Sequence, residues 1–292
     1  MIFISYAQNF EDVMLWRALK HIENGFYIDV GANDPFKDSV TKSFYDHGWH
    51  GINIEPLPLH HATLKENRTR DINLQCAAGA EEGEFNIWET DVRGWATMEP
   101  EVVKQHEKNG HIGTWHKISV FPLSAICGKY VSNEIHFLKI DVEGFELEVL
   151  KGINFNITRP WILIIEATAP ASMLENYDLW ENKVLSAGYI FAYADGLNRF
   201  YVSKEHSELL SFFKYPPNVF DEFISDQVIQ LSEQAKKSQE LAQLAQRQLD
   251  DLYSSTSWFI TKPLRWIESR LNELFRGNKK ALVNKTEDLK DN

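Results

Sequence analysis

The stretch from Phe26 to Val30, together with Gly31 behind it, constrains the fold of this chain more than any other segment. Its side chains are apolar or aromatic except for Asp29, and the run ends at the glycine. Such a run is typical of a strand buried on both faces of a parallel sheet. The glycine predicts a tight turn that leads into a helix over about 35–47, and a second helix is expected over 58–67. In open α/β sheets ligands bind beyond the carboxyl ends of the strands, so we expect a binding site at this turn.

A second strand with the same ending follows. The segment from Gly51 to Glu55 repeats the pattern, because a largely apolar strand again ends in a carboxylate. In nucleotide-binding sheets, a carboxylate at the tip of the second strand usually receives ribose hydroxyl groups. The sequence therefore predicts a ligand that carries a ribose.

The turn after the first strand lacks the usual phosphate-binding signals. The residues behind Gly31 read Ala-Asn-Asp-Pro, so there is neither a Gly-x-Gly-x-x-Gly fingerprint nor a Gly-Lys-Ser/Thr loop. Asp29 and Asp34 would repel a diphosphate. A phosphate-free, positively charged nucleoside such as S-adenosylmethionine fits these observations; the alternative is an ordinary buried turn in a flavodoxin-like sheet.

Five further strands complete the expected sheet, and two of them also end in carboxylates. The predicted strands are 72–78, 135–140 followed by Asp141, 160–165 followed by Glu166, 189–194 and 199–202. Only a short turn separates the last two, which favours an antiparallel hairpin. Parallel strands place their carboxyl ends on one rim of the sheet, so four carboxylates gather there: Asp29, Glu55, Asp141 and Glu166. Stability alone does not explain such a cluster.

The composition allows one large α/β domain with an appendage. The chain has 292 residues, of which 43% are hydrophobic, enough for a substantial core. Its two cysteines, Cys76 and Cys127, are too few for a disulfide framework or a thiolate metal site and favour a reducing cytosol. The N-terminus shows no signal-peptide pattern, and no uncharged run reaches the roughly 18 residues that a membrane-spanning helix needs.

Charge is distributed unevenly along the chain. From Asp226 onward there are 11 basic and 10 acidic residues, which leaves 19 basic and 32 acidic residues before it. An acidic globular part argues against nucleic acid as a partner. We expect an N-terminal helical segment over 1–24, a globular domain over 25–215, and two tail segments over 226–252 and 255–280.

Residues 90–116 interrupt the alternation of strands and helices. The segment is long, aromatic and punctuated by glycines, and such insertions in compact domains are usually functional or disordered. We expect it to bind the acceptor substrate, with Trp95 and Thr97 among the contact residues, because aromatic rings commonly stack on sugar rings. The alternative is that its aromatic residues only cover the core. Its histidines do not share a metal-binding spacing on one helix.

Four motifs in this order resemble the FkbM family of S-adenosylmethionine-dependent methyltransferases, over roughly residues 1–203. They are Ser-Tyr-Ala-Gln-Asn-Phe-Glu-Asp at 5–12, Tyr-Ile-Asp-Val-Gly-Ala-Asn at 27–33, Asn-Ile-Glu-Pro at 53–56 and Leu-Lys-Ile-Asp-Val-Glu-Gly at 138–144. The resemblance implies a Rossmann-like class I methyltransferase fold, with a seven-stranded, mostly parallel sheet and an antiparallel last strand. It also implies O-methyl transfer to hydroxyl groups, frequently on sugars. Pro35 departs from the family pattern, in which a small residue often stands there.

The resemblance also assigns roles at the first two strand ends. Asp29, Gly31 and Asn33 would hold the methionine amine and carboxylate of the donor, and Glu55 would hold its ribose. Apart from the resemblance, the small side chains that end the third strand, including Ala78, would let an adenine ring lie against the backbone. Ordinary packing against a helix is the alternative there.

The expected chemistry is a one-step displacement at a sulfonium methyl group, in which the enzyme aligns the acceptor oxygen and excludes water. A sugar hydroxyl is a poor nucleophile at neutral pH and needs a base or a metal ion. We expect Asp141 to be the base, with Glu143 as the second candidate; pairing of Asp141 with Lys139 on the same strand face is the structural alternative. Glu166 is expected to contact the acceptor, and Asp141 and Glu166 together offer oxygen ligands for Mg²⁺.

The two tail segments differ in composition from the domain. Residues 226–252 are mostly helix formers. Their heptad seam has small side chains at its centre, which predicts a lone helix or a weak coiled coil. Residues 255–280 combine aromatic and aliphatic side chains with arginines and lysines, and the stretch from Ser255 to Arg265 resembles a segment of bacterial cell-surface polysaccharide enzymes. We expect this amphipathic basic segment to lie in a membrane interface; packing on its own domain or on a partner is the alternative.

These observations lead to one functional expectation and two rivals. We expect an O-methyltransferase that acts on a sugar hydroxyl of a bacterial cell-surface polysaccharide or its precursor, in the cytoplasm and at the inner face of the membrane. Its partners would be the glycan acceptor, glycan-assembly enzymes or a second copy of the chain. One rival is a catalytically inactive methyltransferase-like scaffold in a glycan assembly complex. The other, a nicotinamide-dependent oxidoreductase, is disfavoured because the glycine fingerprint is missing.

Overall fold

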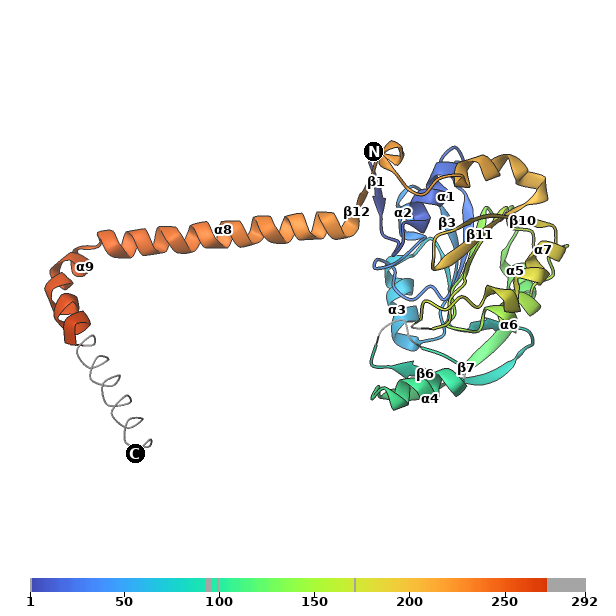
Figure 1. The fold of residues 1–292 in the computed structure, drawn as a ribbon, viewed down its shortest axis with the longest axis horizontal. Helices are drawn as coiled ribbons and strands as arrows, with labels where there is room; N and C mark the ends of the chain where they lie inside the picture. Colours follow the sequence, from blue (N-terminus) through green and yellow to red (C-terminus); the bar gives the residue numbers. More distant parts are fainter. Residues whose placement is uncertain (1, 93–95, 99, 171, 272–292) are drawn as a thin grey trace, which may run out of the picture. The chain divides into compact units, whose positions relative to one another are not determined.

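The computed structural model describes residues 2–92, 96–98, 100–170 and 172–271. The chain divides into two compact units, Met1–Gln227 (unit 1) and Val228–Asn292 (unit 2). Unit 1 combines strands and helices, whereas the described part of unit 2 is helical (Figure 1).

A seven-stranded sheet forms the centre of unit 1. In spatial order its strands are β10 (Tyr189–Ala194), β11 (Asn198–Ser203), β9 (Ile162–Glu166), β8 (Phe137–Ile140), β2 (Phe26–Val30), β3 (His50–Ile54) and β4 (Ile72–Leu74). β11 runs antiparallel to both of its neighbours, whereas the five strands from β9 to β4 are parallel to one another. The expected seven-stranded, mostly parallel sheet with an antiparallel last strand is therefore confirmed.

Apolar side chains pack under helices on both faces of the sheet, because residues alternate between the faces along each strand. The face that carries Ile28 packs against α5 (Leu123–Tyr130), α6 (Glu146–Lys151) and α7 (Glu181–Ser186). The face that carries Tyr27 packs against α1 (Glu11–Leu19), α2 (Lys42–Asp46) and the 3-10 helix η2 (Lys204–Phe213). Burial on both faces explains why these strands are nearly continuous apolar runs in the sequence.

The predicted third strand over 72–78 proves to be two strands in two different sheets. β4 ends at Leu74, and β5 (Ala77–Gly79) pairs instead with β7 (Gly113–Pro122). β7 also pairs with β6 (Gly83–Thr90), so these three strands form a second sheet. The insertion at 90–116 therefore contributes the start of β7, and its α4 (Pro100–Lys108) lies beside the β6–β7 hairpin (Figure 1).

The helix predicted over 35–47 is confined to α2, which begins only at Lys42. The side chain of Asp34 accepts hydrogen bonds from the backbone N–H groups two and three residues later in the sequence, at 2.7 and 2.8 Å. Such local hydrogen bonds compete with helix formation. Asp38 adopts a left-handed φ of 57°, which is incompatible with a right-handed helix at this position. The buried guanidinium of Arg68 holds this loop by donating to the carbonyl oxygen of Pro35.

The other elements of unit 1 are short. α3 (Pro58–Asn67) follows β3 at the predicted position. β1 (Phe3–Ser5) pairs in parallel with β12 (Phe223–Ser225), an association between the two ends of unit 1 that the sequence did not indicate. Two 3-10 turns complete the unit: η1 (Tyr177–Leu179) and η3 (Val219–Asp221).

The described part of the tail consists of three helical stretches. α8 (Asp226–Ser254) has 29 residues, α9 (Thr256–Ile260) follows it, and residues 262–271 are again helical. The predicted amphipathic segment at 255–280 therefore lies partly outside the described residues. Within the part of the chain that the structure describes, no helix is both long enough and apolar enough to cross a membrane.

Candidate functional site

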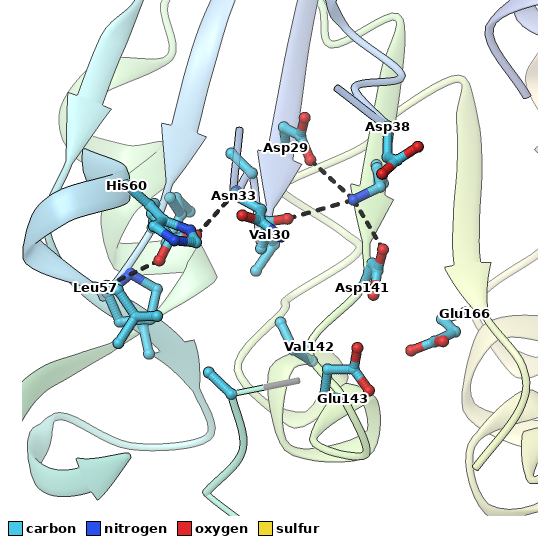
Figure 2. Close-up of a pocket in the computed structure, with 18 of the residues that line it drawn as sticks. Asp29, Val30, Asn33, Asp38, Leu57, His60, Asp141, Val142, Glu143 and Glu166 are labelled. Atoms are coloured by element: carbon cyan, nitrogen blue, oxygen red, sulfur yellow. Dashed lines mark hydrogen bonds and ion pairs between the residues drawn. The ribbon is translucent and has the colours of Figure 1, made fainter. Parts of the chain in front are cut away.

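A cavity of about 540 Å³ opens at the carboxyl ends of the parallel strands β2, β3, β8 and β9 (Figure 2). This volume is within the range of small-molecule pockets. The four carboxylates that the sequence placed on one rim all line this cavity: Asp29, Glu55, Asp141 and Glu166. The cavity therefore lies where an open α/β sheet is expected to bind its ligand.

The turn after β2 accepts only a glycine at its first position. Gly31 has a φ of +80°, and a Cβ atom there would lie 1.8 Å from the backbone oxygen of Asp141. The N–H of Gly31 donates to the carbonyl oxygen of Ile54 at 3.0 Å, which fixes the turn to the end of β3. Asn33 follows with a left-handed φ of 50°, a conformation that asparagine adopts more readily than most residues. The main chain of the turn is thus tied to both neighbouring strand ends.

Glu55 closes β3 and holds the same turn. Its Oε2 accepts the N–H of Asn33 at 2.9 Å, and its Oε1 accepts the N–H of Leu57 at 2.8 Å. A carboxylate can accept about four hydrogen bonds, so both oxygens keep capacity for hydroxyl groups of a ligand. Burial raises the pKa of Glu55 to about 7, although the two backbone donors act in the opposite direction.

A buried lysine lies between two of the rim carboxylates. Lys139 stands opposite Asp29 in the register of β8 and β2, and its Nζ is 3.4 Å from Asp29 Oδ1 and 3.2 Å from Asp141 Oδ2. Burial alone would lower the pKa of Lys139, but Asp141 and Asp29 outweigh it and raise the pKa above its ordinary value. The pairing of Asp141 with Lys139 that the sequence left as an alternative is therefore present, and it extends to Asp29.

A sharp turn after Asp141 brings Glu143 to the cavity. Glu143 has a left-handed φ of 52°, and Gly144 follows with a φ of 98°. The buried carboxylate of Glu146 accepts two backbone N–H groups of this turn, at 3.1 and 3.2 Å. Because Glu146 fixes the backbone, Glu143 is held in a conformation that it would rarely adopt alone.

The carboxyl groups of Asp141, Glu143 and Glu166 lie on the same side of the cavity (Figure 2). Burial, followed by the negative charge of Asp141, raises the pKa of both glutamates well above the ordinary value. Glu166 is 8% exposed, and its Oε2 makes no hydrogen bond to the described residues. The charge of Lys139 is already paired with Asp29 and Asp141, so it does not neutralise the two glutamates. This side of the cavity therefore favours protons, cations or hydroxyl donors as occupants.

The remaining predicted contact residues divide into three cases. Ala78 lines the cavity with its small side chain. Thr97 is buried but does not belong to the lining, because its hydroxyl donates to the carbonyl oxygen of Glu143 at 3.1 Å. Its neighbours Ala96 and Met98 line the cavity instead, so the insertion does reach the site. Trp95 lies outside the described residues.

Some lining residues were not singled out from the sequence. His60 in the first turn of α3 lines the cavity, and burial lowers its pKa. Its position in the sequence, shortly after the strand that ends in Glu55, could have indicated it as a site residue. Asp38 also lines the cavity but gave no signal, because its position depends on the left-handed turn that replaces the predicted helix.

The acidic pair at the start of α1 has structural partners. Asp12 accepts hydrogen bonds from the Ser5 hydroxyl at 2.7 Å and from the N–H of Tyr6 at 2.8 Å. Glu11 accepts a hydrogen bond from the side-chain amide of Asn198 at 2.8 Å. Neither carboxylate lines the cavity: Asp12 stabilises the N-terminal segment itself, and Glu11 connects that segment to the rest of unit 1.

A metal centre has limited support among the described residues. No group of three or more His, Cys, Asp or Glu side chains in that part of the chain is arranged to hold a metal ion. Asp141 and Glu166 would offer an ion two carboxylates, and Asp141 is already paired with Lys139.

Comparison with known proteins identifies the family to which the chain is similar. The family model of the methyltransferase FkbM domain matches residues 29–191, more than half of the chain. Among solved structures, the chain is similar to a TehB-like SAM-dependent methyltransferase from Corynebacterium glutamicum, with 8% sequence identity and a TM-score of 0.37 over 65% of this chain and 88% of that one. No curated protein matches the sequence significantly.

Proposed function

Since the chain belongs to the FkbM family of S-adenosylmethionine-dependent methyltransferases, we propose that it methylates a hydroxyl group of a sugar. The donor supplies a methyl group bound to a sulfonium sulfur. The neutral thioether that remains after transfer is a good leaving group and needs no proton from a protein acid. The protein then has three tasks: to bind the donor, to hold the acceptor oxygen in line with the methyl group, and to exclude water.

The residues on the β2 and β3 side of the cavity fit the donor. Glu55 keeps acceptor capacity for the ribose hydroxyl groups while it fixes the turn. Asp29 Oδ1 lies 3.4 Å from the ammonium of Lys139 but accepts no hydrogen bond from the described residues, and we assign the methionine amine to it. The methionine carboxylate is assigned to the turn from Gly31 to Asn33, and the adenine ring to the surface beside Ala78.

The charge of the cavity is the observation that carries the proposal. Six carboxylates and two lysines are among the described residues that line it. The raised pKa values of Glu143 and Glu166 keep these two protonated near neutral pH, but the other four carboxylates still outnumber the two lysines. This surplus of negative charge attracts a cationic sulfonium and repels the pyrophosphate of a dinucleotide. A donor that carries its own positive charge therefore suits this cavity better than a nicotinamide cofactor does.

Calorimetric titration with S-adenosylmethionine, its demethylated product and NAD tests this assignment. We expect the two sulfur nucleosides to bind and NAD not to bind. Binding of NAD alone would support an oxidoreductase, and binding of none of the three would support a methyltransferase-like scaffold without activity.

We propose Asp141 as the general base, with Glu143 as the second candidate. Lys139 holds Asp141 at the cavity through an ion pair of 3.2 Å, whereas the raised pKa of Glu143 brings its titration nearer to neutral pH. A base whose pKa lies near the working pH is the more effective proton acceptor. The base would take the proton of the sugar hydroxyl as the new oxygen–carbon bond forms.

The variants Asp141→Asn and Glu143→Gln separate the two candidates. Loss of the true base is expected to lower methyl transfer from labelled donor to a surface-glycan extract by about 100-fold or more while donor binding is kept. If Asp141→Asn also abolishes donor binding, Asp141 belongs to the donor site instead.

We further propose that the acceptor belongs to a bacterial surface polysaccharide or its precursor. The carboxylates on the β8 and β9 side disfavour an anionic group beside the reacting hydroxyl and suit a neutral, hydroxyl-rich ring, with Glu166 as a contact. Mass spectrometry of the surface polysaccharide from cells with and without this protein should differ by the mass of one methyl group for each modified residue.

For Mg²⁺, we propose only which two carboxylates would bind it. Mg²⁺ often takes only one or two carboxylates from a protein and completes its shell with water and substrate, and Asp141 and Glu166 would be those two. If the ion is used, dialysis against a chelator lowers turnover but not donor binding, and added Mg²⁺ restores it. Turnover that withstands chelation assigns both carboxylates to the acceptor alone.

A further inference from the structure

The tail beyond α8 has a locally fixed geometry at its start. The hydroxyl of Ser255 accepts the N–H of Trp258 at 3.2 Å and so caps α9. The guanidinium of Arg265 lies 3.4 Å from the centroid of the Trp258 ring and donates hydrogen bonds to the Trp258 carbonyl oxygen and the Thr261 hydroxyl. These contacts tie α9 to the helical stretch 262–271 and explain the spacing of serine, tryptophan, threonine and arginine in the sequence.

An apolar stripe runs along these two helical stretches. Leu264, Ile267 and Leu271 are spaced by three and four residues, which places them on one helical face, and Ile260 precedes them by four residues at the end of α9. All four are between 49% and 70% exposed. Phe259 and Trp266 are exposed as well, and each precedes a stripe residue by one position, so they share one flank of the stripe.

The width of this apolar face decides between the two occupants it could take. The four-three-four spacing alone would suit a seam with a second copy of the chain. A two-helix seam covers only the stripe, however, and would leave Phe259 and Trp266 in water. A lipid surface covers the stripe and its aromatic flank together, and aromatic residues favour the region between headgroups and acyl chains.

The charge of the segment points to the kind of lipid. From residue 255 to residue 271 there are three basic residues and one acidic residue, in a chain whose net charge is −12. Arg265 is held against Trp258, whereas Lys262 lies away from the stripe by helical spacing, where it can meet headgroups while the apolar face is buried. Positive charge here complements anionic headgroups, which would repel the acidic remainder of the chain.

We propose that residues 256–271 bind the surface of an anionic membrane, with the stripe and its aromatic flank inserted between headgroups and acyl chains. This segment lies on the surface and does not span the bilayer, in keeping with the absence of a sufficiently long apolar helix among the described residues. The proposal does not depend on the methyl-transfer reaction, because no residue of the segment lines the cavity.

Sedimentation of the full chain with lipid vesicles tests the proposal. We expect binding to an equimolar mixture of phosphatidylcholine and phosphatidylglycerol to be roughly 30-fold tighter than to phosphatidylcholine alone, since the segment carries a net charge of +2. Added salt should weaken binding to the anionic vesicles, because it screens exposed charges.

Two sets of variants identify the surface that binds. Leu264→Glu combined with Ile267→Glu is expected to lower vesicle affinity by about tenfold or more, because it places charge in the apolar stripe. Leu241→Glu combined with Leu244→Glu makes the same change at two exposed leucines of α8 and should leave binding intact. Lys262→Gln should weaken binding to anionic vesicles by about fivefold and leave binding to neutral vesicles unchanged.

Three results would overturn the proposal. They are equal binding to neutral and anionic vesicles, no binding to either, and a stripe variant that binds vesicles normally. If light scattering then shows that the stripe variant converts a dimer into a monomer, the stripe is a seam between two copies of the chain.

Discussion

Individual side chains at the cavity are distinguished by their neighbours more than by their type. Asp29 and Asp141 share the charge of Lys139, whereas Glu166 has a buried oxygen without a hydrogen bond to the described residues. Glu55 and Glu146 are both buried, and both accept two backbone N–H groups. Each of the two therefore holds a turn in place, but only Glu55 also lines the cavity.

Replacement of Glu55 is the most direct residue-scale test of donor binding. We expect Glu55→Gln to weaken S-adenosylmethionine binding by about tenfold to 100-fold, because hydrogen bonds to a charged acceptor are replaced by weaker or mismatched ones. The control is Glu11→Gln, which alters an equally buried carboxylate with two hydrogen bonds outside the cavity. Similar losses of affinity in calorimetry for both variants would contradict the role of Glu55.

Glu146 provides a pH-dependent test of stability. Burial raises its pKa from 4.5 to about 7, so between these values the folded chain keeps a proton that the unfolded chain releases. The resulting stabilisation is complete below pH 4.5 and is lost as the pH rises through about 7. In Glu146→Gln the amide oxygen can still accept both backbone N–H groups and does not titrate.

We therefore expect the Glu146→Gln variant to gain stability relative to the natural chain as the pH rises from about 5 to about 8, by up to about 3 kcal/mol. Denaturant unfolding at both pH values measures this difference. Glu148→Gln on the same helix serves as the control, since Glu148 lies beside Lys151 at the surface. A constant difference between natural chain and variant at the two pH values would show that Glu146 does not titrate in this range.

At the scale of elements, the site depends on strand ends that are locked to one another. The turn after β2 is bonded to the end of β3 and packs against the backbone at the end of β8. The turn after β8 is held from α6 by Glu146. These connections fix the cavity wall before any ligand binds, which reduces the entropy lost on binding.

Gly31→Ala tests this locking. The substitution places a Cβ atom 1.8 Å from the Asp141 oxygen and requires a left-handed conformation, so we expect a loss of about 2 kcal/mol or more in unfolding free energy together with weaker donor binding. Gly128→Ala is the matched control, because a Cβ atom in this helix meets nothing within 4 Å and alanine favours helices. Equal stability of the Gly31→Ala variant would mean that the turn can relax.

At the scale of the whole molecule, the cavity and the exposed aromatic segment of the tail lie in different units. Every described residue that lines the cavity belongs to unit 1, and the acidic surplus of the sequence lies before Asp226. The exposed aromatic side chains Phe259 and Trp266 belong to unit 2.

A chain that ends at Gln234 tests this division. We expect it to bind S-adenosylmethionine with unchanged affinity, because it keeps the complete cavity and the pairing of β1 with β12. Calorimetry and thermal unfolding of the shortened and full-length chains measure the effect. A large loss of donor affinity would show that unit 2 contributes to the site.

The sequence by itself determined the mostly parallel sheet, most of its apolar strands and the carboxylates at or near their ends. Strands buried on both faces require continuous apolar runs, and a turn under steric constraint requires a glycine, so both leave a local record in the chain. The end of the third strand left no such record, because Ala77–Gly79 has small residues that fit either sheet until β7 pairs with it. The left-handed turn at Asp38 was missed for a similar reason, since distant Arg68 holds that loop.

Only the tertiary structure decided which carboxylates are charged, paired or protonated. Lys139 could have paired with Asp141 alone, and the register of β2 and β8 brought Asp29 to it as well. The raised pKa values of Glu55 and Glu166 come from burial and from charges that lie far away in the sequence, whereas Glu143 combines burial with the charge of Asp141 two residues away. Desolvation and Coulomb interactions act through space, so the sequence could name these residues but could not fix their state.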